Sequence, residues 1–216
     1  MTHSLAIAGF CVRIFMNNKK FIYFDLGGVF FHWRSGLAEI TKKLEVGSGK
    51  LEEIRIRYDD QVCRGKMTTD ELWGKYQEEL GIIGPKNFNF AQEWVKTFTP
   101  IPESHELIKE LIKKYPVGIL TNVYPEVYDL QIKYGFVPDL DYKAVIRSDQ
   151  LGIVKPDPEI YKIAQAKAGV EASEIFYADD QLPNVEAARN LGWLAMWFEE
   201  NNPSKSVREI WEKLGK

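Results

Sequence analysis

The chain has 216 residues, of which 45% are apolar and 27% charged, and its formal net charge at pH 7 is −3. This length suffices for one α/β core with a small inserted domain, but not for two large domains. Its lysines and arginines are scattered, which argues against the basic surface of a nucleic-acid-binding protein. Cys11 and Cys63 have no histidine or cysteine beside them, so neither a zinc site nor a disulfide framework is expected. A cytoplasmic protein is therefore the expectation.

The first part of the chain contains an apolar stretch, Ser4–Met16. No lysine or arginine precedes it, Arg13 interrupts it, and it is too short to span a bilayer. We therefore interpret residues 1–19 as an N-terminal extension rather than a targeting signal, and we expect no association with a membrane.

Five short apolar runs have the length and composition of strands that are buried on both faces of a parallel sheet. The first is Phe21–Phe24, which ends at Asp25. Alternation with segments of helical spacing predicts an α/β fold, with a Rossmann-like three-layer core built around a parallel sheet. The other expected strands are Val117–Leu120, Ala144–Ile146, Ile175–Tyr177 and Leu194–Phe198, and the expected helices of the core are Glu103–Tyr115, Pro125–Tyr134, Glu159–Ala168 and Pro183–Leu191.

Residues 33–99 break this alternation, because the pattern there is helical throughout. Thr68 and Glu71 have the spacing of a capping box at the start of one of these helices. We therefore predict an all-helical cap at residues 33–99, inserted into a core formed by residues 20–32 and 100–216. The expected cap helices are Leu37–Leu44, Leu51–Asp60, Asp70–Leu80 and Asn87–Phe98, and the aromatic side chains Trp33, Tyr58, Trp73 and Trp94 are expected to pack inside the cap rather than line a pocket.

Four polar segments follow the strand-like runs, at the sheet edge where open α/β folds bind ligands. In the first, Asp25 precedes Gly27 and Gly28, and glycine lets the chain turn sharply and its backbone approach a ligand. In the second, the hydroxyl of Thr121 and the amide of Asn122 are suited to hydrogen-bond phosphate. Taken alone, the first segment can equally be a turn or a helix cap, and the second can be the N-cap of the next helix.

The third segment places Lys155 before Pro156, which keeps the lysine out of helical geometry; a solvated charge is the alternative. The fourth is the pair Asp179 and Asp180, whose adjacent carboxylates repel each other unless a cation or hydrogen-bond donors compensate. Carboxylate oxygens suit Mg²⁺, which typically binds one or two carboxylates together with phosphate and water. Capping of the following helix is the structural alternative.

In this order, the four segments resemble the motifs of the haloacid dehalogenase-like (HAD-like) hydrolase superfamily: an Asp loop, a Ser/Thr loop, a Lys loop and an acidic loop. The resemblance covers about residues 21–198, and it points to subfamily I, with a helical C1 cap between the first and second motifs. The Asp-x-Gly-Gly-Val variant resembles glucose-1-phosphatase-like members and the phosphatase-like N-terminal domain of epoxide hydrolases.

The resemblance implies a role for each matching residue. Asp25 matches the nucleophile, Thr121 matches the hydroxyl that holds the phosphoryl group, and Lys155 matches the residue that steadies both. Asp180 matches the principal ligand of the cofactor Mg²⁺, with Asp179 in a supporting position. The remaining matches are Gly27, whose backbone carbonyl would also bind the metal, and Gly28 and Asn122, which would help to bind phosphate.

Gly27 departs from the usual pattern, because typical phosphatases of the superfamily carry a second Asp there that protonates the leaving alcohol and then activates water. General acid–base catalysis is worth about 10²–10⁴-fold. The sequence therefore predicts a slower phosphatase, or one that acts on a good leaving group, and it predicts that Gly27→Asp gains activity on poor leaving groups. His32 is an alternative acid, but we favour a surface or cap-packing role for it.

The resemblance thus implies a Mg²⁺-dependent phosphatase that hydrolyses a small, sugar phosphate-like monoester through an aspartyl-phosphate intermediate. Two alternatives stay open. One is a dehalogenase, in which the aspartate attacks carbon and no metal is needed; the other is a catalytically weak phospho-ligand-binding module that lacks the general acid. The expected partner is a small phosphorylated metabolite, with no nucleic acid and no membrane, and the expected assembly is a monomer or homodimer.

Overall fold

A computed structural model describes residues 19–47, 49–85 and 87–215 of the chain, so all but the last residue of the predicted N-terminal extension lies outside the described residues. Five parallel strands form the main sheet in the order β5-β4-β1-β6-β7. The expected α/β, Rossmann-like fold is therefore confirmed. The strands are β1 (Phe21–Phe24), β4 (Val117–Thr121), β5 (Ala144–Arg147), β6 (Ile175–Asp179) and β7 (Leu194–Trp197).

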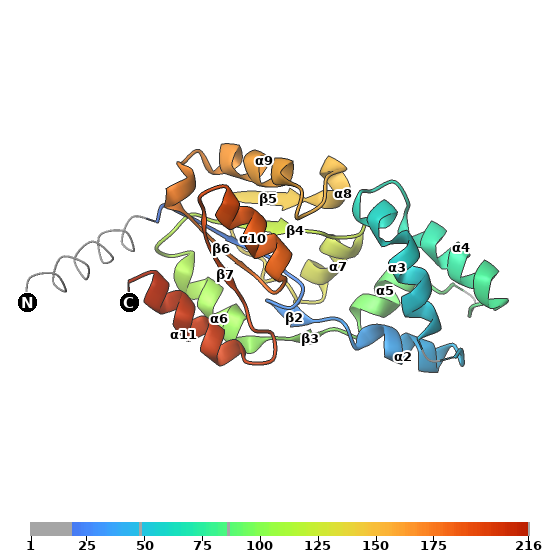
Figure 1. Cartoon of the computed structure of the whole chain (residues 1–216). Helices are drawn as coiled ribbons and strands as arrows, with labels where there is room; N and C mark the ends of the chain where they lie inside the picture. Colours follow the sequence, from blue (N-terminus) through green and yellow to red (C-terminus); the bar gives the residue numbers. More distant parts are fainter. Residues whose placement is uncertain (1–18, 48, 86, 216) are drawn as a thin grey trace, which may run out of the picture.

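Helices cover both faces of this sheet, which gives the core its three layers (Figure 1). Because side chains alternate along a strand, Ile22 and Phe24 of β1 belong to one apolar cluster, which includes residues of α6, α7 and α11. Phe21 and Tyr23 belong to a second cluster, on the face that α9 and α10 cover. The core helices are α6 (Pro102–Leu111), α7 (Val127–Lys133), α8 (Ser148–Leu151), α9 (Pro158–Ala168), α10 (Leu182–Asn190) and α11 (Pro203–Lys213), with a short 3₁₀ turn η1 (Ala172–Glu174).

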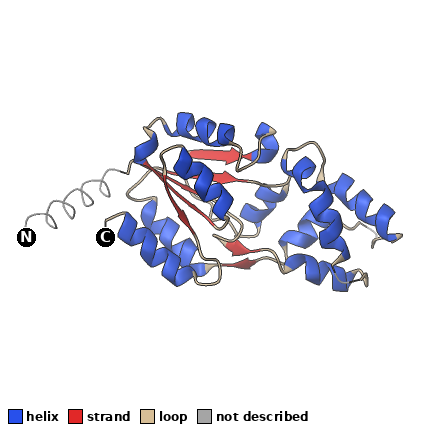
Figure 2. Cartoon of the chain, viewed as in Figure 1, coloured by secondary structure: helices blue, strands red, loops and turns tan. Residues whose placement is uncertain are grey.

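A two-stranded antiparallel ribbon separates the sheet from a helical region, because β2 (Phe31–His32) pairs with β3 (Thr99–Pro100). The described residues between these two strands form helices and connecting turns but no strand. The helices project from one end of the molecule (Figure 2). These helices are α2 (Gly36–Lys43), α3 (Lys50–Cys63), α4 (Thr69–Leu80) and α5 (Phe90–Val95). We refer to residues 33–99 as the cap region; its independence as a domain stays a prediction.

Local capping explains where two of these helices begin. The side chain of Thr68 accepts a hydrogen bond from the N–H of Glu71, and the Glu71 carboxylate accepts one from the N–H of Thr68, so the predicted capping box is confirmed. Helix α5 is shorter than the sequence predicted, because the Asn89 side chain caps the N–H of Gln92 at 2.7 Å and starts the helix at Phe90.

Aromatic side chains join the cap region to the core. Phe31 stacks on Phe98 with ring centroids 5.0 Å apart, and Phe98 packs against Phe136 at 5.7 Å. Trp94 lies 5.5 Å from Phe98 and 5.4 Å from Tyr124, which follows β4. One apolar cluster therefore continues from the sheet into the cap region.

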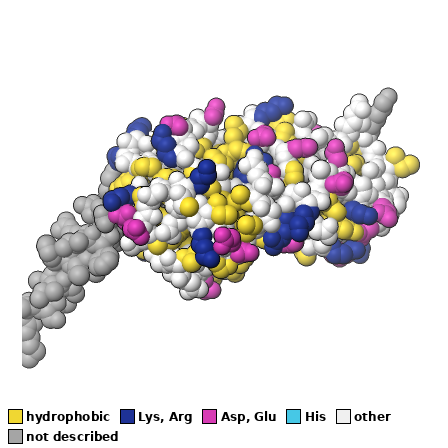
Figure 3. All heavy atoms as spheres, turned by 90° about the horizontal axis from the view of Figure 1, so that it is seen from above, with side chains coloured by type: hydrophobic (Ala, Val, Ile, Leu, Met, Phe, Trp, Pro, Cys, Tyr) yellow, Lys and Arg dark blue, Asp and Glu magenta, His cyan; other side chains and the backbone are white. Residues whose placement is uncertain are grey.

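The surface is mixed in charge on the face shown in Figure 3, where acidic and basic side chains are interspersed with apolar ones. Across the described part of the chain, no helix combines the length and the apolar character that crossing a bilayer requires.

Packing at the centre of the sheet generates a first prediction. A Cβ atom at Gly118 would lie 2.5 Å from Cε1 of Tyr23 and 2.8 Å from the carbonyl oxygen of Ala144. We expect Gly118→Ala to lower the free energy of unfolding by about 1–3 kcal/mol, because overpacking forces these neighbours to shift. Gly74→Ala is the matched control, in an exposed part of α4. Apart from its chain neighbours and the backbone of the helix itself, nothing lies within 4 Å of the added Cβ. The better helix propensity of alanine should therefore raise the free energy of unfolding by about 1 kcal/mol. Urea titration measures both values, and equal effects would contradict this packing.

Candidate active site

The four polar segments meet at the carboxyl edge of the sheet, as parallel strands require. Asp25 follows β1, Thr121 ends β4 and Asp179 ends β6, while Lys155 lies in the loop between α8 and α9. Asp25, Thr121, Asn122 and Lys155 all line one cavity of about 860 Å³. The structure thus brings together the predicted site residues from distant parts of the chain.

A buried ammonium group lies at the centre of this site. Lys155 is 4% exposed, and its Nζ lies 2.9 Å from Oδ1 of Asp25 and 2.7 Å from Oδ2 of Asp179. It also donates to the carbonyl of Leu120 at 3.0 Å and to the hydroxyl of Tyr177 at 3.1 Å. Burial disfavours the lysine charge, but the Asp179 and Asp25 carboxylates outweigh that effect and hold its pKa above the ordinary value. A fixed positive charge therefore faces the predicted nucleophile.

Asn122 holds the lysine loop in place. Its Nδ2 donates to the carbonyl of Lys155 at 3.0 Å, and its Oδ1 accepts from the N–H of Lys155 at 2.8 Å. The sequence predicted a phosphate-binding amide, whereas here the amide is engaged by the backbone of the adjacent loop. The neighbouring hydroxyl of Thr121 makes only a long hydrogen bond of 3.3 Å, to the Asn122 carbonyl, and is the freer of the two groups.

The two adjacent aspartates differ in their surroundings. Asp179 is fully buried, and both of its carboxylate oxygens are hydrogen-bonded. Oδ2 accepts from Lys155, Tyr177 and Asn184, while Oδ1 accepts from Asn184 and from the N–H of Gln181 at 2.7 Å. Asp179 thus has the partners of a structural anchor for the lysine.

One carboxylate oxygen of Asp180 accepts a hydrogen bond and the other does not, as far as the structure describes the chain. Its Oδ2 accepts a hydrogen bond from Arg34 at 2.6 Å, but its buried Oδ1 has no hydrogen-bond partner among the described residues. Oxygens of Asp25, Asp179 and Asp180 lie within 4.8 Å of one another. Burial raises the pKa of Asp180 to about 6, and Asp179 adds to that shift while Arg34 and Lys155 oppose it. An unpartnered buried oxygen among like charges fits a divalent cation.

The surroundings of Asp25 also disfavour its charged form. Burial raises its pKa to about 7; Lys155 opposes the shift, and the carboxylates of Asp179 and Asp180 add to it. Gly27, which precedes the positive-φ residue Gly28, lines the same cavity as Asp25. The Gly27 carbonyl and the carboxylates of Asp25 and Asp180 are the oxygen donors that would hold Mg²⁺.

Gly28 has a different role from the one that the sequence predicted. Its φ is +75°, and a Cβ atom there would overlap the carboxylate of Asp180. Its N–H donates to the carbonyl of Phe31 at 2.9 Å, so this amide closes the loop rather than pointing at a phosphate. Glycine is needed at position 28 because it leaves room for Asp180.

Side chains of the cap region complete the cavity, and sequence patterns did not identify them. Trp33 and Trp94 both line it, so the expectation that they pack only inside the cap region was wrong. Trp73 fits that expectation, with Phe88 4.6 Å away. Tyr58 packs against the same cluster and donates to Glu79. Neither of these two belongs to the cavity lining.

Arg55 is a charged side chain on the cap side of the cavity that several hydrogen bonds hold in place. It donates to both carboxylate oxygens of Glu52 at 2.8 Å and to Oδ1 of Asp59 at 2.5 Å. The hydroxyl of Tyr124, in the core, donates to the same Asp59 oxygen at 2.6 Å. All four side chains line the cavity, which therefore has a polar rim that bridges cap region and core.

His32 lies outside the cavity lining. Its Nδ1 is 2.9 Å from Oε1 of Glu200, and Arg34 donates to the other oxygen of that carboxylate at 2.5 Å. This geometry supports the surface role that we favoured over an acid role.

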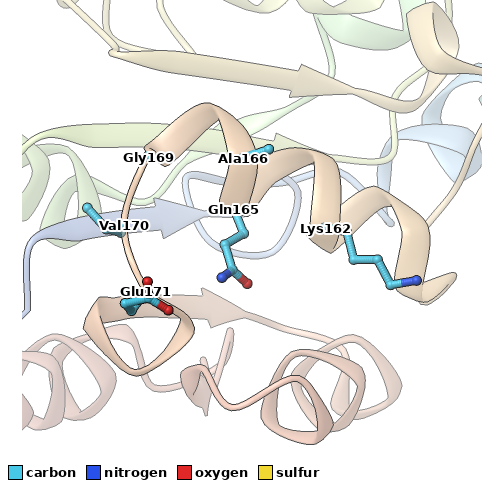
Figure 4. Close-up of a pocket in the computed structure, with 6 residues that line it drawn as sticks. All are labelled: Lys162, Gln165, Ala166, Gly169, Val170 and Glu171. Carbon is cyan, nitrogen blue, oxygen red and sulfur yellow. The ribbon is translucent and has the colours of Figure 1, made fainter.

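A second hollow, of about 410 Å³, lies at the end of α9 and carries none of the predicted site residues (Figure 4). Gln165, which Figure 4 shows between the helix and the Glu171 turn, accepts a hydrogen bond from Trp193. Lys162 pairs with Glu159. We therefore assign no chemistry to this hollow.

Known proteins resemble the chain over most of its length. Residues 19–192 match the family model described as haloacid dehalogenase-like hydrolase. A sesquiterpene phosphatase from Aspergillus oryzae is 25% identical, over 84% of this chain and 91% of its own length. An (S)-2-haloacid dehalogenase from Xanthobacter autotrophicus is also 25% identical, over 88% and 79%. Mouse acyl-CoA dehydrogenase family member 10 is 26% identical over 90% of this chain, which spans only 19% of that protein.

The fold is shared with a HAD family enzyme from Bacteroides thetaiotaomicron whose structure contains magnesium and inorganic phosphate. The TM-score is 0.70 at 24% identity, and the match covers 83% of this chain and 93% of that enzyme.

The different surroundings of the carboxylates generate a stability prediction. We expect Asp179→Asn to lower the free energy of unfolding by about 3 kcal/mol, because it removes one partner of a buried ion pair and leaves Lys155 less compensated. Asp25→Asn should change it by less than about 1 kcal/mol, because Lys155 keeps Asp179 while one of three crowded negative charges disappears. Chemical denaturation of both variants measures the difference. Equal losses would show that Asp179 is not the anchor of the lysine.

Proposed function

This chain belongs to the haloacid dehalogenase-like hydrolases, and from that premise we propose that it is a Mg²⁺-dependent phosphatase of a small phosphomonoester. One observation carries the proposal: Asp25 lies beside a fixed ammonium and close to Asp180, whose buried Oδ1 has no partner among the described residues. The arrangement supplies a nucleophile, a positive charge and a place for a divalent cation at one end of a large cavity.

The proposed reaction has two steps. A carboxylate oxygen of Asp25 attacks phosphorus, the bond from phosphorus to the alcohol oxygen breaks, and the alcohol leaves an aspartyl-phosphate, which water then hydrolyses. When held by Asp25, Asp180 and the Gly27 carbonyl, Mg²⁺ would supply positive charge that offsets the negative charge of the reacting groups. Lys155 orients Asp25 and neutralises charge on the transferred group, and the hydroxyl of Thr121 donates to a phosphate oxygen. The N–H groups of Leu26 and Gly27 have no backbone partner within the described segments and are further donors.

The cavity suggests the kind of alcohol that the phosphate carries. Its rim presents the carboxylates of Glu52, Asp59 and Asp60 together with Arg55, and the indole of Trp33 forms one wall. Carboxylate acceptors, a guanidinium donor and an aromatic face suit a compact group with several hydroxyls. We therefore propose a sugar phosphate-like substrate, a small phosphorylated metabolite.

The rival reaction, dehalogenation, has relatives of the same similarity, so sequence identity does not decide between the two. The carboxylate cluster favours the phosphatase, because a substitution at carbon needs no metal and gives the buried oxygen of Asp180 nothing to bind.

Metal binding is tested by thermal unfolding. We expect Mg²⁺ to raise the Tm of the wild-type protein, because a ligand that binds only the folded state stabilises it, by about 2.7 kcal/mol at 100 times Kd. Asp180→Asn should abolish most of the rise, whereas Asp60→Asn, at the distant rim, should keep it. A wild-type Tm that does not respond to Mg²⁺ would contradict a metal site here.

Catalysis is tested with p-nitrophenyl phosphate, acetyl phosphate and a panel of sugar phosphates, each with and without Mg²⁺. We expect Mg²⁺-dependent phosphate release that Asp25→Asn lowers by at least about 10³-fold, because the nucleophile is lost. Mass spectrometry of acid-quenched protein should find phosphate on Asp25. Halide release from 2-haloacids without Mg²⁺ would favour the dehalogenase, and phosphate binding without turnover of any ester would favour the binding module.

A further inference from the structure

The place of the missing acid is occupied by another side chain. A Cβ atom built on Gly27 would lie 2.9 Å from both Cδ1 and Nε1 of Trp33, closer than real Cβ contacts. The indole thus fills the space into which a longer side chain at position 27 would extend. Trp33 and Gly27 line the same cavity as Asp25.

The indole is held firmly enough to keep that space. The guanidinium of Arg34 lies 4.9 Å from the centroid of the Trp33 ring, and that of Arg55 lies 5.3 Å from it. Cation–π contacts of this kind are attractive and favour one orientation of the ring. Trp94 packs edge-on against the same ring at 5.9 Å. The ring therefore has contacts with three side chains that restrict its rotation.

Both arginines are themselves fixed by carboxylates. Arg34 is bound to Asp180 and Glu200, which belong to the core. Arg55 is bound to Glu52 and Asp59, which belong to the cap region. Trp33 is consequently held from the core and from the cap region at once.

The polar atom of the ring is available for a ligand. Among the described residues, Nε1 of Trp33 has no hydrogen-bond partner, and the side chain is only partly buried, in the lining of the cavity. This N–H lies beside Gly27, which is two residues from the nucleophile and lines the same cavity.

We propose that Trp33 takes the place of the absent acid, that its indole N–H donates a hydrogen bond to the leaving oxygen, and that the enzyme therefore selects phosphate esters whose leaving group departs as a stable anion. Aryl and enol phosphates are esters of this class, and acyl phosphates are anhydrides with the same property. Among the sugar phosphates proposed above, those esterified at the more acidic anomeric hydroxyl come nearest to it. The proposal rests on the phosphatase function proposed above.

The leaving group can depart in this step without taking a proton from the protein. As the Asp25 oxygen bonds to phosphorus, the electron pair of the breaking P–O bond goes to the leaving oxygen, which departs as an anion. The indole keeps its proton and stabilises that anion through the hydrogen bond, and solvent water protonates the product after release. An alkoxide of low stability would have no acid to help it leave.

The same geometry corrects the sequence-based expectation for Gly27→Asp. With Trp33 in place, the new carboxylate has no room, so the single variant should lose activity on every ester rather than gain it. An acid at position 27 becomes possible only when the indole is removed as well.

The test compares kcat/KM for p-nitrophenyl phosphate and phenyl phosphate, which differ in the acidity of the leaving phenol. Trp33→Phe removes the N–H and should lose about tenfold more activity on phenyl phosphate than on p-nitrophenyl phosphate, as expected for a hydrogen bond to developing charge. On phenyl phosphate, kcat/KM of the double variant Gly27→Asp/Trp33→Ala should exceed that of Trp33→Ala by about 10²-fold. This is the low end of the rate effect of general acid catalysis. Trp73→Phe, in the interior of the cap region, is the matched control and should keep the wild-type ratio of the two esters.

Different results would contradict the phosphatase function and the role of the Trp33 indole. No Mg²⁺-dependent turnover of any ester by the wild-type protein would end the proposed function. Turnover with equal losses of Trp33→Phe on both esters would end only the role of the indole N–H. A folded Gly27→Asp variant that gains activity on phenyl phosphate would show that Trp33 does not exclude an acid. If the double variant fails to unfold cooperatively, the ester ratio of Trp33→Phe still decides.

Discussion

The buried ammonium of Lys155 is the constraint on which the rest of the site depends. A charge of this kind is tolerated in the interior only when carboxylates and hydrogen-bond acceptors surround it. Two neighbouring parallel strands provide them, because the register that pairs Phe24 with Ala178 brings the next residues, Asp25 and Asp179, to the same edge. The sheet therefore does more than support the site: its register fixes the distance between the nucleophile and the anchor of the lysine.

Adjacent residues in the acidic loop divide two tasks. Asp179 gives both oxygens to the protein and keeps Lys155 in position, while Asp180 keeps one buried oxygen without a partner among the described residues. A pair of carboxylates that served only the metal would leave the lysine uncompensated, and a pair that served only the lysine would leave no site for a cation. Burial raises the pKa of Asp25 and of Asp180, and a divalent cation bound there would favour their charged forms.

Local signals in the sequence were enough for the core but not for the cavity. The run Phe21–Phe24 predicted β1 without error, and the Thr68 capping box marked the start of α4, because both depend on neighbouring residues. Three of the four motif segments directly follow strands, and the lysine segment follows the short helix α8 after β5, so their order along the chain made them recognisable. The partners of Asn122 and Gly28 were not predictable, since they belong to other loops and become neighbours only in the folded chain. The short ribbon β2–β3 and the final helix α11 were missed, the ribbon because two residues per strand carry no periodic pattern.

Gly27 illustrates why a residue that is absent from a motif cannot be interpreted from the motif alone. In the sequence, Gly27 stands where typical phosphatases of the superfamily carry an acid. In the structure, the absence of a side chain at Gly27 leaves room for the indole of Trp33. The indole in turn depends on Arg34 and Arg55, whose carboxylate partners lie on opposite sides of the cavity. Loss of either arginine would remove one of the contacts that hold the ring beside Gly27. The proposed metal site and the position of the indole are therefore parts of one arrangement, because Arg34 contacts both Asp180 and Trp33, and a change in either is expected to alter the other.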